Sequence, residues 1–559
     1  MKHLMLIILI TIAAAGMAVS AEQTTHVQET RVFSGGNILT VDAKFSVADA
    51  MAIRGSTILA VGNKADVLAV VGKGSIHKHI DLKGKTVLPG FIDAHNHMIA
   101  SSALSLFKKV GLAQYRNVDD ALVYMKKQAA GATAQDWLLF INIDLSTQAF
   151  SEPALTTKHL NAISSLAPVV VWHAGGHKMT VNSAMLNLMG VTDDTPNPTG
   201  SEFTRYKDGS PDGNILGAGA LFKALAVIEP FTKFNKSEGV QKLHADWVAR
   251  GLTTVGLPGV QSPSDWKVAT RLAASPNFNI RTRAYLLWTL LDQWDKAEIK
   301  PGDGNNMARA IGWKISVDGS NQAFTGLQRE HYLNREDHGL EYMKLSDMES
   351  AVIEGTNRGG QIMMHGNGDA AIDNIIAAVS KSRQKNTKPI RPRIEHCSIV
   401  QDDQIEKLIE NNITCSFLIG HVLLWGQAFR DNVFGLEKAQ KLDRTGSFEK
   451  AGIAYSLHTD FGVTDLSPLE MVEVAVTRTL FAEPDYVLAP EERASIEGAI
   501  RGITSAAAWQ LMSESEIGSL EAGKLADFVL LAKDPRKVAP KAIGEIEVLQ
   551  TWIDGKRIH

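Results

Sequence analysis

Cysteine is nearly absent from this chain, which has two, Cys397 and Cys415, among 559 residues. So few cysteines exclude a disulfide framework as the main source of stability, which must therefore come from a hydrophobic core. The two thiols could pair with each other. Isolated cysteines in a large domain are more often free and buried, and that is the state we expect.

An excess of charge of one sign is also lacking, because the formal net charge is -4 and the sequence pI is about 6.5. A nucleic-acid backbone or an anionic membrane is bound by a broad basic surface, so we expect neither nucleic acid nor a lipid surface as a partner. With 45% hydrophobic and 21% charged residues, the composition is that of a globular protein with a large core.

Long apolar runs are missing after the N-terminus, where Lys2 precedes an apolar stretch from Leu4 to Ala18 and the small residues Val19-Ser20-Ala21. This pattern is typical of a secretory signal, so residues 1–21 are interpreted as a signal peptide of a periplasmic or secreted protein. An uncleaved anchor is the alternative, but a spanning helix needs about 20 apolar residues. We expect no stable membrane insertion after the signal is removed.

Eight short apolar or β-branched runs, each ending in small or polar residues, are distributed along the chain. They are Val87–His97, Gly251–Gly259, Ile280–Thr289, Ile311–Ser320, Gln361–Gly368, Pro392–Ser398, Ile413–His421 and Ile453–Gly462. Helix-like patterns such as 370–381 and 402–410 separate most of them. Alternating strands and helices in this number predict an α/β fold, a (β/α)8 TIM-like barrel.

Two features surround the predicted barrel, which we place at 87–505. The gap of about 150 residues after the first run is far longer than a normal connection, so residues 99–250 are predicted to form an insertion subdomain over the barrel mouth. Short strand patterns fill 22–86 and 506–559, and we expect these two ends to form one small composite β-sandwich domain.

His95-Asn96-His97 ends the first predicted barrel strand. Side chains two apart on a strand point to the same side, so both imidazoles could bind one metal. A pair of histidines at this spacing is weak support alone, but barrel active sites lie at the C-terminal ends of the strands.

Four more candidates occupy other predicted strands: Lys314, His365, His396 and Asp460. A lone buried histidine is usually a hydrogen-bonded core residue, but a coincidence of this many at strand ends favours a metal site. Imidazole and carboxylate ligands suit zinc and similar divalent ions.

Lys314 is the unusual member of this set, because an ammonium group cannot bind a cation. It could serve as a neutral amine, or as a carbamate formed with carbon dioxide, whose two oxygens would bridge two metals. The alternative is an ordinary lysine paired with a carboxylate such as Asp318.

Several motifs together resemble the amidohydrolase superfamily and, within it, amidohydrolase family 3, the branch with N-substituted formamide deformylase-like and exoenzyme-regulatory-protein-like members. They are Val87 to His97 at the barrel start, Gly176-His177 with Val181-Asn182-Ser183, Lys314 with Asp318-Gly319-Ser320, His365 to Asp369, Arg393-Ile394-Glu395-His396, Asp460, and Gly518 to Asp527. The resemblance runs from Arg31 to Ile558.

This resemblance implies one or two divalent ions, most often Zn2+. One would be held by His95, His97 and Asp460, and a second by His365 and His396, with a carbamylated Lys314 between them. Asp460 would also be the general base toward water and would then protonate the leaving nitrogen.

By the same analogy, His177 and His421 would face the substrate and stabilise the oxyanion; the alternative is that each is a core residue. Asp318 would orient Lys314 or touch substrate, and Arg478 is interpreted as structural. One departure is Gly217, which stands where family members often carry a glutamate; it weakens any substrate contact inferred there.

The function that we predict is metal-dependent hydrolysis of a carbon–nitrogen bond other than a peptide bond, in a small amide, N-acyl or cyclic amide. Two alternatives remain open: a catalytically weak regulatory or binding protein, and an esterase or lactonase that uses the same metal site. The intact ligand set argues against the first. Trp172, Phe203 and Tyr206 are candidate pocket walls, and their apolar character favours a hydrophobic acyl or aryl group. The oligomeric state is open, with a homodimer among the options.

Overall fold

The structure is a computed structural model that describes residues 29–72, 77–385 and 387–559. The predicted signal peptide, residues 1–21, lies outside the described residues. Among the helices of the described ranges, none has the length and hydrophobicity needed to cross a membrane.

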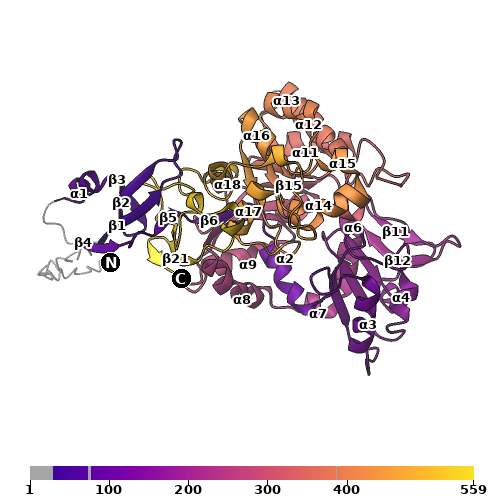
Figure 1. Cartoon of the computed structure of the whole chain (residues 1–559). Coiled ribbons are helices and arrows are strands. Elements are labelled where there is room, and N and C mark those ends of the chain that lie inside the picture. The colour runs from indigo at the N-terminus through magenta and orange to yellow at the C-terminus, as the bar shows by residue number, and fades with distance from the viewer. Residues whose placement is uncertain (1–28, 73–76, 386) are drawn as a thin grey trace, which may run out of the picture.

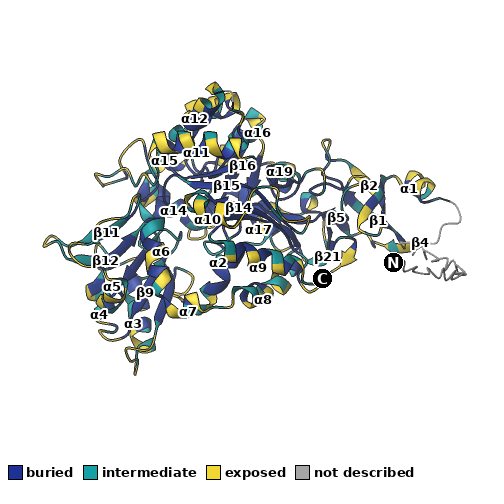
Figure 2. Ribbon diagram, turned by 180° about the vertical axis from the view of Figure 1, so that it is seen from behind, coloured by how far each residue is buried: buried dark blue, intermediate teal, exposed yellow. Residues whose placement is uncertain are grey.

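Eight parallel strands form the centre of the molecule (Figure 1) and follow one another in chain order around a barrel. They are β6 (Phe91–Asp93), β13 (Leu252–Val260), β14 (Arg281–Leu287), β15 (Ala308–Ser316), β16 (Gln361–Gly366), β17 (Ile390–His396), β18 (Thr414–Phe417) and β19 (Tyr455–Leu457). Figure 2 shows these strands as almost wholly buried. A parallel bridge between Asn96 and Phe461 joins the first strand end to the last. The predicted (β/α)8 barrel is confirmed.

Helices cover the outside of the barrel. They include α9 (Pro263–Ala273), α11 (Leu345–Asn357), α12 (Asp369–Gln384), α13 (Asp402–Glu410) and α17 (Pro468–Thr477). The start of α17 shows how the sequence sets these boundaries. Ser467 caps the N–H of Glu470 while the Glu470 carboxylate accepts the N–H of Ser467, and Pro468 occupies the first turn.

The first predicted run, Val87–His97, is two strands instead of one. Its first part is β5 (Thr86–Pro89), which pairs with β20 (Phe528–Leu531) outside the barrel, and its second part is β6. Gly90 separates them, and a Cβ atom there would lie 2.4 Å from the Thr253 side chain. Only glycine therefore lets the chain pass from one sheet to the other at this point.

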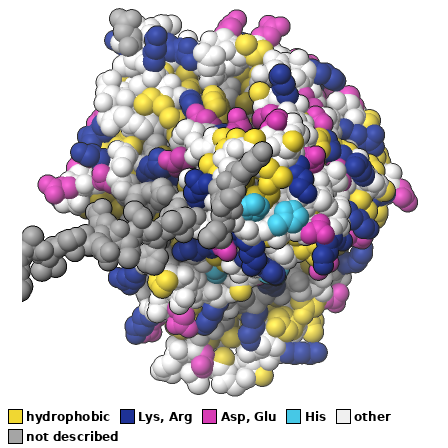
Figure 3. Space-filling view, turned by 90° about the vertical axis from the view of Figure 1, so that its left-hand side faces the viewer, with side chains coloured by type: hydrophobic (Ala, Val, Ile, Leu, Met, Phe, Trp, Pro, Cys, Tyr) yellow, Lys and Arg dark blue, Asp and Glu magenta, His cyan; other side chains and the backbone are white. Residues whose placement is uncertain are grey.

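The two chain ends, for which we predict a composite β-sandwich domain, contribute strands to one continuous sheet in the order β22-β21-β20-β5-β1-β2-β3 with β4 beside β1. Its other elements are β1 (Thr30–Leu39), β2 (Val47–Arg54), β3 (Thr57–Gly62), α1 (Lys64–Val71), β4 (His77–Asp81), β21 (Val548–Ile553) and β22 (Lys556–Arg557). Phe33 from one end packs on Phe528 and Trp552 from the other, with ring centroids 5.2 and 5.3 Å apart. Figure 3 views this end, where positive and negative side chains are intermingled.

The insertion between β6 and β13 contains a six-stranded sheet in the order β11-β12-β10-β9-β8-β7. Its elements are α2 (Met98–Ser101), β7 (Lys108–Lys109), α3 (Val118–Gln128), β8 (Leu138–Ile143), α4 (Thr157–Asn161), β9 (Val169–His173), β10 (Lys178–Val181), α5 (Ser183–Met189), β11 (Glu202–Arg205), β12 (Pro211–Leu216), α6 (Ala218–Val227), α7 (Glu229–Thr232) and α8 (Lys236–Ala249). Alternation along β8 sends Leu139 and Ile141 to a core shared with α6, and Leu138 and Phe140 to a core shared with α3. The α6 side is the one that meets the barrel mouth.

The two cysteines form a disulfide, so our expectation of free thiols is wrong. Cys397 follows directly on β17, and Cys415 lies on the neighbouring strand β18, where it pairs in register with Ile394. His396 and Cys397 both have positive φ, 66° and 49°, which turns the chain back toward β18. The two Cα atoms are then 5.9 Å apart, within the range that a disulfide spans.

Candidate metal-binding active site

Closure of the barrel brings the ends of the first and last strands together. The carboxylate of Asp93 accepts hydrogen bonds from Asn96 Nδ2 at 2.9 Å and from the Thr459 N–H at 3.0 Å. The N–H of Asp460 donates to the carbonyl oxygen of His95 at 3.0 Å. Segments more than 350 residues apart in the sequence are thereby fixed beside each other.

Three ligand atoms meet at this closure. His95 Nε2 and His97 Nε2 are 3.3 Å apart, and they lie 3.3 and 3.2 Å from Asp460 Oδ1. Donor atoms bound about 2.0 Å from a tetrahedral ion are about 3.3 Å from one another. The triangle therefore has the edge length that a zinc-like ion requires.

Lys314 Nζ is buried at the site and has no hydrogen-bond partner among the described residues, while Asp460 Oδ1 faces the two imidazole nitrogens of the triangle. Buried polar atoms are nearly always satisfied, so an unpartnered one at the site indicates that something else binds there. Burial alone would raise the pKa of Asp460, but His95 and His97 together lower it well below its ordinary value. The carboxylate is thus ionised and suited to hold a cation, and the residues fit a divalent metal.

Glu395 lies behind His95 and completes the arrangement. Its carboxylate is 2.5 Å from His95 Nδ1, so the imidazole donates there and presents the Nε2 lone pair to the triangle. Arg393 donates to Glu395 Oε2 at 2.9 Å. Burial raises the pKa of Glu395, yet Arg393 and His95 outweigh it and hold the pKa well below its ordinary value. A histidine ligand oriented by a carboxylate is the usual support of a protein metal site.

A second group of ligand atoms consists of His95, His396 and His458, whose donor atoms lie within 4.8 Å of one another. Burial holds the pKa values of His396 and His458 well below the ordinary range, and the neighbouring His365 and His95 lower that of His396 further. Both imidazoles are therefore neutral, which is the form that binds metals. His365 lies close by, with its ring centroid 4.4 Å from that of His396, but it belongs to neither group. Its Nε2 instead faces the Gly319 carbonyl at 3.1 Å. The assignment of His365 as a ligand stays a prediction.

Lys314 is on β15 and lines the same cavity. No ion pair within 4.0 Å joins it to Asp318 in the described part of the chain; Asp318 instead accepts the N–H groups of Leu327, Asn367 and Gly368. Burial lowers the pKa of Lys314 to about 8. The neutral amine, which carbamate formation requires, is therefore more populated near neutral pH than for an ordinary lysine.

One cavity contains His177 and all six predicted metal-binding residues, with the apolar side chains of the insertion opposite them. The apolar wall comprises Leu104, Ile141, Trp172, Leu221, Phe222, Leu225, Phe231 and Leu287, together with Phe461 and Val463. Burial lowers the pKa of His177 to about 4, so this imidazole is neutral. The site has a polar, metal-binding end and an apolar end.

Several predicted contacts are placed elsewhere. His421 does not line the cavity; it is buried, with Nδ1 3.2 Å from Ser398 Oγ. Phe203 belongs to the core of the insertion and Tyr206 lies at a separate surface groove, so of the three expected wall residues Trp172 alone lines the cavity. Arg478 is buried and donates to main-chain carbonyls, in agreement with a structural role.

Gly217 precedes α6, with φ of 81°, and a Cβ atom there would be 2.4 Å from the Gly200 carbonyl oxygen. No glutamate could fit, and the N–H of Gly217 binds the His177 carbonyl instead.

Sequence reasoning missed His458 and the role of Glu395. A signal existed for both, because His458 is two residues before Asp460, and Arg393 and Glu395 are two residues apart on β17. Alternation places such pairs on one side of the chain.

Comparison with known proteins agrees with this geometry. The chain is 27% identical over 531 residues to the N-substituted formamide deformylase of Arthrobacter pascens, covering 93% of this chain and 96% of that one. It is also 27% identical to Protein LONG AFTER FAR-RED 3 of Arabidopsis thaliana, with 94% and 91% coverage. An uncharacterized metal-dependent hydrolase from Pyrococcus horikoshii shares the fold, with a TM-score of 0.71 at 22% identity and coverage of 92% and 99%. The amidohydrolase family model matches residues 78–559. The chain therefore belongs to the amidohydrolase family, in its family 3 branch, and is a hydrolase of the metal-dependent amidohydrolase superfamily.

Proposed function

We propose that this protein hydrolyses a carbon–nitrogen bond, other than a peptide bond, in a small amide that carries an apolar group. The observation that carries the proposal is the triangle of His95 Nε2, His97 Nε2 and Asp460 Oδ1, with edges of 3.2–3.3 Å, in a cavity that is otherwise lined largely by apolar side chains.

A divalent ion such as Zn2+, held by His95, His97 and Asp460, would polarise the scissile carbonyl and make water a stronger nucleophile at neutral pH. The ionised Asp460 carboxylate would accept a proton from the attacking water and return it to the leaving nitrogen. A neutral His177, on the cavity wall, can donate a hydrogen bond to the developing oxyanion.

Lys314 supports a second ion in this proposal. Its Nζ is buried and has no hydrogen-bond partner in the described part of the chain, and a carbamate on it would add two oxygen ligands to those that His95, His97, Asp460 and His396 offer in the same cavity. The neighbouring His458, in the group with His396 and His95, is a further ligand candidate for that ion.

The apolar wall defines the substrate class. Leu221, Phe222 and Leu225 of α6 and Trp172 of β9 face the cavity, and they offer no charged partner. Binding pockets select groups whose polarity matches their walls, so an aryl or alkyl substituent fits here better than a charged one.

The cellular location of the protein is proposed from its sequence alone. The cationic start, the apolar run and the small-residue ending within residues 1–21 support a signal peptide and hence work outside the cytoplasmic membrane. Fractionation of cells that produce the full chain, with N-terminal sequencing of the product, tests this: an intact N-terminus in the cytoplasm would contradict it.

The first experiment is elemental analysis of protein purified without chelators, with native mass spectrometry for a carboxyl group on Lys314. About two divalent ions per chain with a carbamate would support the two-metal form. Loaded protein is then tested on 4-nitroacetanilide, N-alkyl formamides, a lactam and 4-nitrophenyl acetate, with N-acetylaspartate as the charged control. Hydrolysis of apolar amides is expected; turnover of the ester alone would favour an esterase, and metal-free, inactive protein would favour a binding role.

A further inference from the structure

The side chain of His177 forms a hydrogen bond with Tyr342, and its ring also lies 5.0 Å from that of His365. The Tyr342 hydroxyl lies 3.2 Å from His177 Nδ1, and the two rings are 6.0 Å apart. His177 belongs to the insertion, in the turn between β9 and β10, whereas Tyr342 follows barrel strand β15. This contact therefore joins the two parts of the molecule that enclose the cavity.

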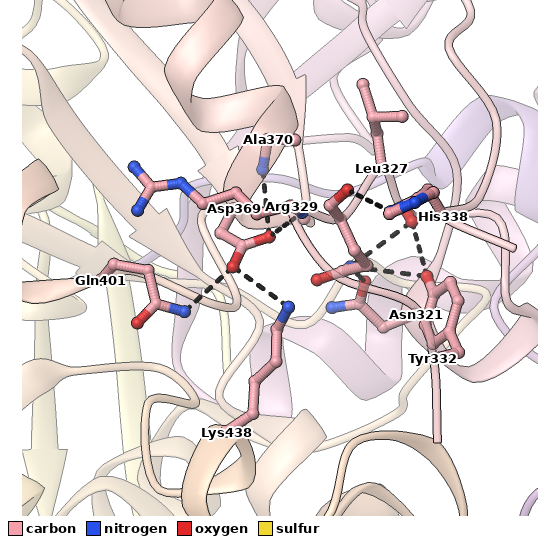
Figure 4. Close-up of polar contacts among 12 residues, drawn as sticks. Asn321, Leu327, Arg329, Tyr332, His338, Asp369, Ala370, Gln401 and Lys438 are labelled. Carbon is pink, nitrogen blue, oxygen red and sulfur yellow. Dashed lines mark hydrogen bonds and ion pairs between the residues drawn. The ribbon is translucent and has the colours of Figure 1, made fainter. Parts of the chain in front are cut away.

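The segment that carries Tyr342 is firmly held. Asp369 of α12 accepts the N–H of Arg329 at 2.8 Å and bonds from Gln401 and Lys438 at 2.9 and 3.0 Å, which anchors the segment in its middle (Figure 4). Nearer to His177, the N–H of Tyr342 donates to the Val317 carbonyl at 2.8 Å.

Two glycines leave room for Tyr342. A Cβ atom on Gly200 would be 2.7 Å from Tyr342 Cα, and one on Gly319 would be 2.7 Å from the Tyr342 hydroxyl oxygen. Larger residues at either position would displace the tyrosine. The ring thus sits in a fitted position from which its hydroxyl reaches His177.

The chemistry of the pair allows Tyr342 to be the donor. Burial raises the pKa of Tyr342 above its ordinary value, so its hydroxyl keeps its proton. The neighbouring Thr325 Oγ1 already accepts the Ser320 N–H and donates to the Ser320 carbonyl. His177 Nδ1 lies at hydrogen-bond distance from the Tyr342 hydroxyl and can accept a hydrogen bond from it.

We infer that Tyr342 is a positioning residue: its hydroxyl donates to His177 Nδ1 and so keeps the single proton of the neutral imidazole on Nε2, the nitrogen that would serve the substrate. The other tautomer would present a lone pair to the substrate oxygen and repel it. This inference rests on the proposed function, since it gives His177 the donor that amide hydrolysis needs. The Gly217 N–H, bound to the His177 carbonyl, holds the main chain in the same orientation.

The test combines Tyr342→Phe, which removes the hydroxyl and keeps the ring, with Tyr332→Phe as a matched control. Tyr332 is a buried tyrosine of the same segment whose hydroxyl donates to the Gly326 carbonyl at 2.6 Å, away from the cavity (Figure 4). Both zinc-loaded variants are compared with the parent protein by kinetics and by 15N NMR of histidine-labelled protein, with His177 assigned from His177→Asn.

In the parent protein and Tyr332→Phe, the His177 proton is expected on Nε2; in Tyr342→Phe it is expected to distribute over both nitrogens. For the amide that the panel identifies, kcat of Tyr342→Phe should fall about 10- to 100-fold while KM changes less than about threefold. A proton on Nδ1 in the parent protein, or an unchanged tautomer and kcat in Tyr342→Phe, would overturn the inference. The NMR measurement of the tautomer needs no substrate, so it tests the role of Tyr342 independently of the proposed function. If the protein hydrolysed no amide but carried the His177 proton on Nε2, the positioning role of Tyr342 would be supported and the proposed function would be rejected.

Discussion

Glu395→Gln is the sharpest perturbation of the metal site, because it changes one charge and almost no volume. The glutamine oxygen can still accept the His95 Nδ1–H, but the negative charge that makes His95 a stronger ligand is lost. Removing the carboxylate partner of a histidine ligand typically lowers metal affinity by about 10- to 100-fold. By RT ln K, this corresponds to about 1.4–2.7 kcal/mol of binding free energy.

Stability should fall in the same variant. Arg393 is fully buried, and Glu395 is the carboxylate that it pairs with. A buried charge that loses its partner destabilises a protein by about 3–5 kcal/mol. We expect the lower end of this range, because the glutamine oxygen and the Ala94 carbonyl still accept from the guanidinium.

The assay is a competition titration in which a chromogenic chelator removes zinc from the folded protein, with circular dichroism as a check on folding. Glu410→Gln is the matched control, since Glu410 is exposed and far along α13 from the site. A zinc Kd within twofold of the parent value, in a folded Glu395→Gln protein, would refute the claim that this carboxylate supports the metal site.

Four further outcomes follow from the same structure. Asp460→Asn should abolish turnover while leaving the fold intact, and near-normal kcat would remove its role as base. Lys314→Ala should bind about one metal per chain and regain part of its activity with small carboxylates; unchanged stoichiometry would reject the carbamate. Cys415→Ser removes the disulfide between residues that are 18 positions apart, and it should lower the free energy of unfolding by about 3 kcal/mol. A urea midpoint equal to that of the parent protein would contradict this. Burial raises the pKa of Glu492, but hydrogen bonds from Ser447 and Arg444 outweigh it and lower the pKa in the folded state. Ionised Glu492 therefore stabilises the fold above its unfolded pKa of about 4.3, and this stabilisation is lost as the pH falls through the lower pKa of the folded state. The melting temperature of Glu492→Gln should therefore depend less on pH between 5 and 3.

The barrel could be predicted because each strand leaves a local signal, an apolar run that ends in small or polar residues. The division of Val87–His97 into β5 and β6 left no such signal. Both halves are apolar, and what separates them is their partners: β5 pairs with β20, more than 400 residues later, and β6 pairs with β13. Pairings over such distances cannot be read from one segment of sequence.

The candidate site was partly predictable for the same reason. His95, His97, His396 and Asp460 stand at strand ends, where position in the chain implies position in the barrel. His421 also ends an apolar run, but there the chain turns into the π-helical segment η4 (His421–Trp425) and carries the side chain away from the cavity. The direction in which a chain leaves a strand depends on its neighbours, and neither composition nor periodicity contains it.

His421 is nevertheless connected to the site through hydrogen bonds. Its Nδ1 faces Ser398 Oγ, which donates to Asn367 Oδ1, and the Asn367 amide donates at 2.7 Å to the Gly319 carbonyl that also faces His365. A histidine at the end of an apolar run can thus be connected to the site through hydrogen bonds without lining the cavity.

Barrel closure and metal binding depend on the same few bonds. Asp93 fixes Asn96, between the candidate ligands His95 and His97, and Thr459, next to the candidate ligand Asp460. The Asp460 N–H, bound to the His95 carbonyl, closes the remaining gap. An ion at the triangle would join these strand ends a second time, and any ligand that binds only the folded state stabilises that state. Between β6 and β19 the described structure has a bridge in place of a paired ladder, so the metal would add stability where the barrel has the fewest backbone bonds of its own.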